Sequence, residues 1–205
     1  MRQLARNPFF WAFVVGCVVI TSMRPLLRRI PPPPPLLRQV PRFALVAADG
    51  KPFGSDDLRG HVYVASFFFT RCPSICPRLM QDVARLQERY RRDHLDVRLV
   101  SITVDPEHDT AEVLSAAGPR YGVDPARWVL LTGPWPAIRD LALHGFQVPL
   151  GEPEKAPGQP TDIAHTGKLL LVDASGGLRG YYDTGDLGLD EVFWRSKSVL
   201  EQKTG

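Results

Sequence analysis

Cysteine is scarce in this sequence, and its scarcity excludes two classes of protein. The 205 residues contain only three cysteines, Cys17, Cys72 and Cys76. Three are too few to staple a disulfide-rich scaffold, and too few for a zinc site made of four thiolates. Any metal site in this chain must therefore recruit other ligands.

Acidic side chains are absent from the first 42 residues, which hold seven arginines. The whole chain has a net charge of +3, but from Phe43 onward 18 basic residues face all 22 acids, which leaves about −4. This balance excludes a basic domain that binds nucleic-acid backbones, so we expect no nucleic acid among the partners. With 44% hydrophobic residues, the chain can bury the core of one globular domain.

Charge is also missing from Pro8 to Met23, an apolar run between Arg6 and Arg24. As a helix this run covers roughly 24 Å, which is short for a membrane span, although flanking arginines can reach back to the interface. No convincing small-x-small cleavage site follows it. We therefore interpret residues 1–29 as a cytoplasmic tip and an uncleaved single-pass anchor.

Two further features of the N-terminal region bear on this interpretation. Cys17 has a context that superficially suits lipidation, but apolar residues follow it, which favours a small residue within a membrane helix. The linker of residues 30–42 contains five consecutive prolines, which predict a stiff polyproline II spacer of about 3 Å per residue. More arginines follow the apolar run than precede it, and charge counting alone would leave the domain in the cytoplasm.

From Phe43 to Gly205 the pattern alternates between strands and helices. Apolar and β-branched runs predict strands at residues 43–47, 62–70, 97–104, 128–131, 168–173 and 178–182. Periodic spacing predicts helices at residues 77–92, 109–121 with a break near 118–119, 135–144 and 187–200. This order predicts an α/β protein with the thioredoxin-like fold, a mixed central sheet flanked by helices.

Two of the cysteines lie where a predicted buried strand meets a predicted helix, in the sequence FTRCPSICP of residues 69–77. At a helix start, unpaired N–H groups and the helix dipole favour a thiolate, so we expect a lowered pKa for Cys72 or Cys76. A helical turn places both sulfurs on one face, where they could share one soft metal ion or form a disulfide. Two merely structural cysteines would need neither this position nor two flanking prolines.

A metal site with two thiolates needs a third ligand, and the chain offers five histidines. His165 differs from the rest because it lies between the Gly/Pro-rich loop of residues 148–161 and the strand predicted from Lys168. This end of the sheet is the one that carries the cysteines. The other four have ordinary surface or capping explanations: His61, His94, His108 and His144.

Three motifs, in this order, resemble the SCO/SenC family of copper chaperones. They are Phe-Thr-Arg-Cys-Pro-x-x-Cys-Pro, then Val-Asp-Pro-x-x-Asp-Thr, then a histidine before a Leu-Val-Asp strand. The resemblance covers about residues 43–200 and is specific because all three motifs occur together. It implies that Cys72, Cys76 and His165 are copper ligands and that Asp105 is an auxiliary acid near them.

The resemblance also implies a function and partners. Family members help to assemble the binuclear copper centre of cytochrome c oxidase subunit II, by delivering copper or by preparing its cysteines, and they receive copper from a donor protein. The chain is then a metallochaperone and not an enzyme, with an auxiliary thiol-disulfide reductase activity. The resemblance also implies a bacterial inner membrane, with the domain in the periplasm. We give this implication more weight than the arginine count, which would leave the domain in the cytoplasm.

The ligand chemistry is compatible with copper in both oxidation states. Copper(I) accepts two thiolates, and copper(II) gains from an imidazole and a nearby oxygen. Zinc is not excluded by ligand type, but it prefers a closed site with four ligands. Asp105 precedes a proline, and Asp-Pro commonly opens a turn, so this residue also has a purely structural explanation.

Two other classes of function compete with this interpretation. A thiol-disulfide oxidoreductase or peroxidase would use Cys72 as the nucleophile and Cys76 as the resolving thiol. Against it stand three residues between the cysteines instead of two, and the absence of a proline directly before the Lys168 strand. A structural membrane protein explains the anchor and the prolines, but it leaves the cysteines and His165 without a role.

Overall fold

The computed structural model describes residues 8–27, 31–73, 75–150 and 167–203, in two compact units that divide at Pro31 and Pro32. The first unit contains one helix, α1 (Pro8–Leu27). Within the described part of the chain, no helix is both long enough and apolar enough to cross a membrane. The expected anchor therefore stays a prediction.

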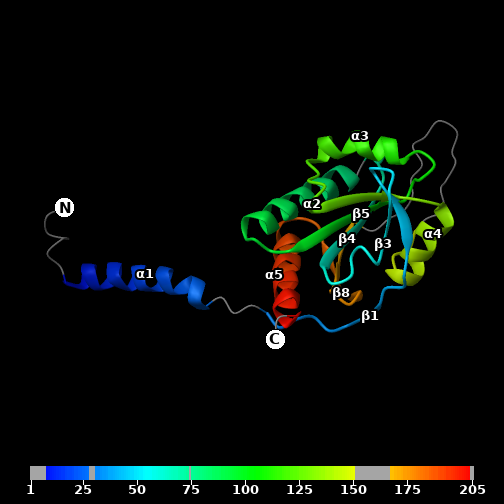
Figure 1. Ribbon diagram of the computed structural model, residues 1–205. Helices are drawn as coiled ribbons and strands as arrows, with labels where there is room; N and C mark the ends of the chain where they lie inside the picture. Colours follow the sequence, from blue (N-terminus) through cyan, green and yellow to red (C-terminus); the bar gives the residue numbers. More distant parts are fainter. Residues whose placement is uncertain (1–7, 28–30, 74, 151–166, 204–205) are drawn as a thin grey trace. The chain divides into compact units, whose positions relative to one another are not determined.

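The second unit is built on one mixed sheet of eight strands (Figure 1). The strands, in chain order, are β1 (Arg38–Gln39), β2 (Ala44–Ala47), β3 (Pro52–Gly54), β4 (Val62–Phe68), β5 (Val97–Thr103), β6 (Trp128–Thr132), β7 (Lys168–Val172) and β8 (Gly177–Asp183). Their spatial order is β1-β8-β7-β4-β5-β6-β2-β3. The fold class is therefore α/β, as the sequence predicted.

Strand β4 occupies the middle of the sheet, and all seven of its residues are buried. It runs parallel to β5, with Phe68 opposite Thr103, and antiparallel to β7, with Ala65 opposite Leu170. The last residues of β4 and β5 and the first residue of β7 therefore lie at the same edge of the sheet. This geometry brings the segments after residue 68, after residue 103 and before residue 168 together.

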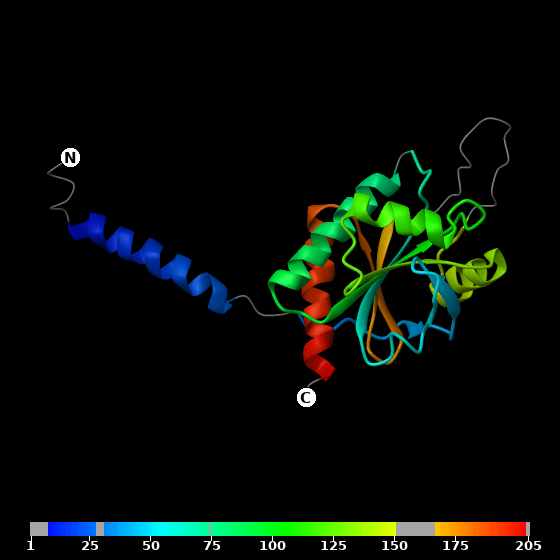
Figure 2. The ribbon, with the colours of Figure 1, turned by 45° about the horizontal axis from the view of Figure 1, so that its top comes forward.

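Helices cover both faces of the sheet (Figure 2). They are α2 (Ile75–Arg92), α3 (Ala111–Tyr121), α4 (Trp135–Asp140), which continues as the π-helical turn η2 (Leu141–Gly145), and α5 (Asp186–Lys203). The neighbouring residues Phe67 and Phe68 point to opposite faces of β4. Phe68 packs edge-on against Tyr121 of α3, whereas Phe67 packs edge-on against Phe146, which follows η2.

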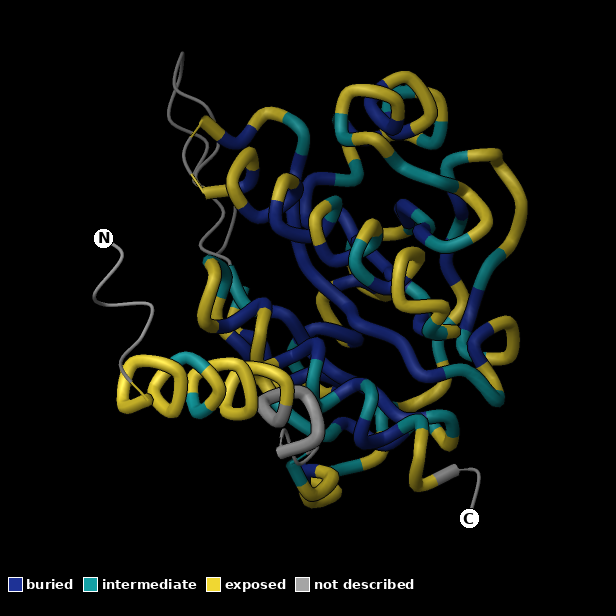
Figure 3. The backbone as a smooth tube through the Cα atoms, turned by 90° about the vertical axis from the view of Figure 1, so that its left-hand side faces the viewer, coloured by how far each residue is buried: buried dark blue, intermediate teal, exposed yellow. Residues whose placement is uncertain are grey.

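The sheet strands supply about half of the buried apolar core, and Figure 3 shows where the buried backbone lies. Helices α2 and α5 are joined through Tyr90 and Phe193, whose rings stack with centroids 5.6 Å apart. The Tyr90 hydroxyl also forms a buried hydrogen bond with Ser196, 2.8 Å long. Because α5 packs on α2, the closing helix stabilises the helix that carries Cys76.

Two predictions about the helices differ from the observed structure. Helix α2 begins at Ile75, two residues before the predicted start. The predicted break near Gly118 and Pro119 is wrong, because α3 continues through Pro119 to Tyr121. Proline is tolerated here because the helix ends one turn later, where Gly122 caps it in the left-handed conformation, with φ 70°.

The proline-rich segment lies against the domain from Pro32 onward. Arg195 donates a hydrogen bond to the Pro32 carbonyl at 2.8 Å, and Arg179 donates one to the Pro34 carbonyl at 3.1 Å. Polyproline backbone makes no hydrogen bonds of its own, so its carbonyls are open to such donors. Residues that the sequence analysis expected to act as a free spacer thus form part of the compact unit, which begins before Phe43.

Candidate metal centre

The junction of β4 and α2 carries two of the expected metal ligands. After β4 the chain turns at once, because the Cys72 N–H donates to the Phe69 carbonyl at 3.3 Å. Thr70 and Arg71 are the central residues of this turn. Cys72 follows it, and Cys76 lies in the first turn of α2.

The two thiols lie next to each other at the start of the helix. The Cys76 N–H donates to the Cys72 sulfur at 3.4 Å. Cys72 is 7% exposed and Cys76 2% exposed, and the two are thiols rather than a disulfide. The Cys72 sulfur therefore lies beside an N–H group of the first turn of the helix, as predicted.

The lowered pKa expected for at least one of the two thiols does not occur at Cys76. Burial raises the pKa of the Cys76 thiol well above its usual range. Its hydrogen bond with the backbone of Phe69 lowers the pKa, but by less, and the neighbouring Cys72 and Asp109 raise it further. The position at the helix start is as expected, but the loss of water around the sulfur outweighs it.

The third expected ligand, His165, and most of the loop of residues 148–161 lie outside the described residues. The description resumes at Gly167, directly before β7. A Cβ placed on Gly167 would lie 2.4 Å from Cδ1 of Ile75. The backbone two residues after His165 therefore packs against the residue that immediately precedes Cys76.

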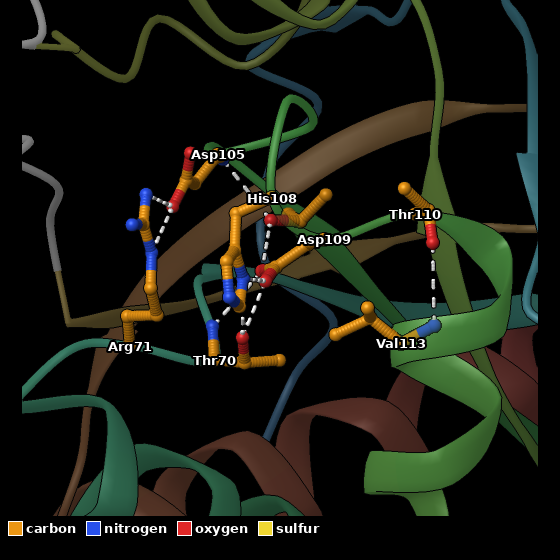
Figure 4. A network of polar contacts seen from close by, with 8 residues as sticks. Thr70, Arg71, Asp105, His108, Asp109, Thr110 and Val113 are labelled. Carbon is orange, nitrogen blue, oxygen red and sulfur yellow. Dashed lines mark hydrogen bonds and ion pairs between the residues drawn. The ribbon is translucent and has the colours of Figure 1, made fainter.

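Asp105 has a partner that the sequence analysis did not identify. Its carboxylate is buried, and its Oδ2 accepts hydrogen bonds from Nη2 of Arg71 at 2.7 Å and from Nε of the same side chain at 3.1 Å (Figure 4). Arg71 is the residue before Cys72. Asp105 therefore lies beside the cysteine segment, as the resemblance implied, but its carboxylate is engaged by a guanidinium.

Asp109 is the functional candidate that sequence reasoning missed. It was quoted in the second motif and interpreted as the start of a helix, but it was given no role in the site. Its side chain is fully buried. Oδ2 accepts from Thr70 N at 2.9 Å and from Thr103 Oγ1 at 2.6 Å, while Oδ1 accepts from Thr70 Oγ1 and pairs with His108 Nδ1 at 2.9 Å (Figure 4). Asp109 thus joins the segments that follow β4 and β5.

The histidines within the described residues have the structural roles that were expected for them. His108 pairs with Asp109, and His61 pairs with Asp96 at 3.2 Å. His94 adopts a positive φ of 53° in the turn before β5. His144 lies 3.8 Å from Asp140 in the preceding turn of its helix. Asp105, His108 and Asp109 are close enough to surround an ion, but both carboxylates already have donors.

Comparison with known proteins places this arrangement in a family. The SCO1/SenC family profile matches residues 34–200. A SCO1 protein homolog of Bacillus subtilis is 31% identical over 82% of this chain and 86% of its own length. A putative copper-binding protein of Stutzerimonas stutzeri is 30% identical over 72% of this chain and 70% of its own length.

Solved structures agree in fold. The crystal structure of a SCO1/SenC family lipoprotein from Bacillus anthracis covers 81% of this chain and 97% of its own, with a TM-score of 0.75 and 32% identity. BsSco, described as a cytochrome c oxidase assembly protein with a disulfide switch, covers 82% of this chain and 98% of its own, with a TM-score of 0.71 and 28% identity. The chain therefore belongs to the SCO1/SenC family.

Proposed function

We propose that this chain binds one copper ion through Cys72, Cys76 and His165 and takes part in the assembly of cytochrome c oxidase. The observation that carries the proposal is the contact between the Cys76 N–H and the Cys72 sulfur, which places two thiols side by side at a helix start. Copper(I) is a soft ion that two thiolates can hold. The copper-binding relative and the oxidase-assembly relative support the same metal and the same process.

The position of Gly167 supports His165 as the third ligand. Gly167 follows His165 by two residues, and its backbone packs against Ile75, the residue before Cys76. An imidazole is a harder ligand than a thiolate and favours copper(II). A site with two sulfurs and one imidazole can therefore hold the ion in both oxidation states.

The exposed residues beside the buried thiols suit a site that must release its metal to a partner. Cys76 is buried, while the adjacent Ile75 is 37% exposed and Pro73 is exposed. A partner that contacts this exposed rim approaches the sulfurs without the domain having to unfold. We propose that the partner is the copper-containing subunit II of the oxidase and that a separate donor protein supplies the copper.

The proposal is tested by the copper content of the reduced protein and of its cysteine variants. We expect one copper(I) per wild-type chain after desalting, none for Cys72→Ser or Cys76→Ser, and one for Cys17→Ser. The Cys17→Ser variant is the matched control, because it removes a thiol that lies in the separate helix α1. Retention of one tightly bound copper by the double variant Cys72→Ser/Cys76→Ser would disprove the site.

Thiol-disulfide exchange is a second candidate function, favoured by the same contact between the two cysteines. Cys72 is the more exposed of the pair and would attack a target disulfide, and Cys76 would resolve the mixed disulfide. This activity would prepare the cysteines of the target for copper. Incubating the domain with an oxidised substrate peptide and following the free thiols of the peptide tests it.

We propose that α1 anchors the chain in a bacterial inner membrane with the domain in the periplasm. The proposal rests on the apolar run of Pro8–Met23 and on the compartment in which an oxidase subunit presents its copper centre. A reporter that is active only in the periplasm, fused after Gly205, is expected to be active. Activity of a cytoplasmic reporter instead would favour an inward-facing thiol redox protein.

A further inference from the structure

The turn of residues 69–72 is stabilised by hydrogen bonds to residues of another loop. Its closing hydrogen bond joins Cys72 N–H to the Phe69 carbonyl, and its central residues are Thr70 and Arg71. Thr70 donates both its N–H and its hydroxyl to Asp109, and Arg71 donates two N–H groups to Asp105. Both central residues of the turn are therefore attached to the segment of residues 105–109.

The segment of residues 105–109 is itself closed and rigid. The Asp109 N–H donates to the Asp105 carbonyl at 2.8 Å, and the His108 N–H donates to the same carbonyl at 3.1 Å. Thr103, the last residue of β5, adds a third connection through its hydroxyl to Asp109. The segment is thus fixed to the end of a central strand, and its hydrogen bonds can fix the conformation of the turn beside it.

Of the two attachments, the one through Asp109 is the stronger. A buried carboxylate is costly unless hydrogen bonds satisfy it, and Asp109 is fully buried with hydrogen-bonding partners on both oxygens. The side chain of Arg71 is 45% exposed, so its ion pair with Asp105 is weakened by water and salt. Displacement of Thr70 would leave part of a buried negative charge without a donor.

We infer that Asp109 is a positioning residue for the copper site, acting through Thr70. Asp109 fixes the conformation of the Phe69–Cys72 turn, and this conformation places the Cys72 sulfur against the N–H of Cys76. Two sulfurs that are held in register lose little freedom when a metal ion binds them, and this raises the affinity for copper(I). The inference rests on the proposed function and assigns to Asp109 a role distinct from that of a ligand.

The test compares variants that cut the connection with a variant that removes an equivalent buried carboxylate elsewhere. Thr70→Val keeps the side-chain shape and removes the hydroxyl donor, Thr70→Ser keeps the donor, and Asp109→Asn removes the charged acceptor. Asp173→Asn is the matched control, since Asp173 is also buried with four donors, but at the turn that follows β7. All variants carry Cys17→Ser, so that only the pair is probed.

Copper(I) affinity is measured by competition with a chromophoric copper(I) chelator, well below the melting temperature of each variant. We expect Asp109→Asn and Thr70→Val to bind about tenfold more weakly, the effect of losing a hydrogen bond to a charged group. Thr70→Ser should bind like the Cys17→Ser background, and Asp173→Asn should melt earlier with unchanged affinity.

A second probe separates failure of this inference from failure of the proposed function. Phenylarsine oxide binds two adjacent thiols by forming two As–S bonds with loss of one water, and it needs no copper. Weaker arsenical binding by Asp109→Asn and Thr70→Val supports the positioning role even if the domain binds no copper(I). Unchanged binding of both probes in these two variants, or an equal loss in Asp173→Asn, overturns it.

Discussion

Each end of the central sheet contains a buried aspartate that accepts hydrogen bonds from four donors. At the end where β4 and β5 finish, Asp109 accepts from Thr70, Thr103 and His108. At the end where β7 finishes, Asp173 accepts from the N–H and hydroxyl of Ser175, from Gly177 N–H and from Arg179. The two carboxylates have the same chemistry and nearly the same burial.

The donors differ in where they lie along the chain. All the donors of Asp173 lie within six residues of it, so that carboxylate shapes a single turn between two neighbouring strands. Thr70, by contrast, lies 39 residues before Asp109, and the contact joins the loops that follow two parallel strands. A buried aspartate thus stabilises a local hairpin at one end and assembles a site from separate segments at the other.

The largest loss of stability is expected from a substitution in the hydrophobic core that both ends of the sheet share. Phe67→Ala deletes a fully buried ring near the end of β4 and should lower the free energy of unfolding by about 4 kcal/mol. Because one core supports both ends, circular dichroism and tryptophan fluorescence should report a single common transition in urea. Two separate transitions would show that the ends are stabilised independently.

The sequence was sufficient to predict the elements whose patterns are strong. The uninterrupted apolar run of β4 and the three- and four-residue spacing in α2 predicted both elements to within two residues. Strands β7 and β8 were also predicted, to within one residue at each end. Docking of Pro32 and Pro34 was not predictable, because it depends on Arg179 and Arg195, which lie far away in the sequence.

A smaller effect is expected at the Asp173 end, where Arg179 joins the turn to the proline-rich segment. Arg179→Met should lower the free energy of unfolding by about 2 kcal/mol, because it leaves a buried carboxylate with one donor fewer. The matched control is Arg195→Met, which also loses a hydrogen bond to a proline carbonyl, but whose ion pair with Glu191 is 3.8 Å long. This control should cost about 0.5 kcal/mol or less.

Copper(I) affinity shows whether the two ends of the sheet act independently. Neither Arg179→Met nor Arg195→Met should change it, since both residues belong to the end of the sheet away from the cysteines. Urea denaturation gives the stabilities, and chelator competition gives the affinities. A weaker copper site in Arg179→Met would mean that the two ends of the sheet are coupled.

The smallest effect is a dependence of stability on pH. Burial acts to raise the pKa of Asp173, but hydrogen bonds from Ser175, Gly177 and Arg179 outweigh it, and the pKa lies below the usual value of 3.8. The folded state therefore favours the charged form, so this stabilisation is complete above about pH 5 and is lost as the pH falls through the folded pKa. Asp173→Asn should show a shallower fall in unfolding free energy between about pH 5 and pH 3. An equal slope in both proteins would contradict this.

The position of the two cysteines was predictable, but the contacts that support them were not. Cys72 and Cys76 were recognisable from a short motif at a strand–helix junction, and both thiols lie there. Pairwise contacts such as Thr70 with Asp109 join residues from different loops, and no local pattern indicates which side chains will meet. The raised pKa of Cys76 was missed for a related reason, because burial depends on the packing of the whole domain.

The proposed copper site is tested most directly by X-ray absorption at the copper edge of the copper(II)-loaded protein, compared between wild type and His165→Ala. We expect two sulfur ligands and one imidazole nitrogen in the wild type, and loss of that imidazole alone in the variant. Copper(I) should keep both sulfur ligands in both proteins, because two thiolates are sufficient for it. An imidazole signal that persists in His165→Ala, or fewer than two sulfurs in the wild type, would contradict the assignment of Cys72, Cys76 and His165 as the copper site.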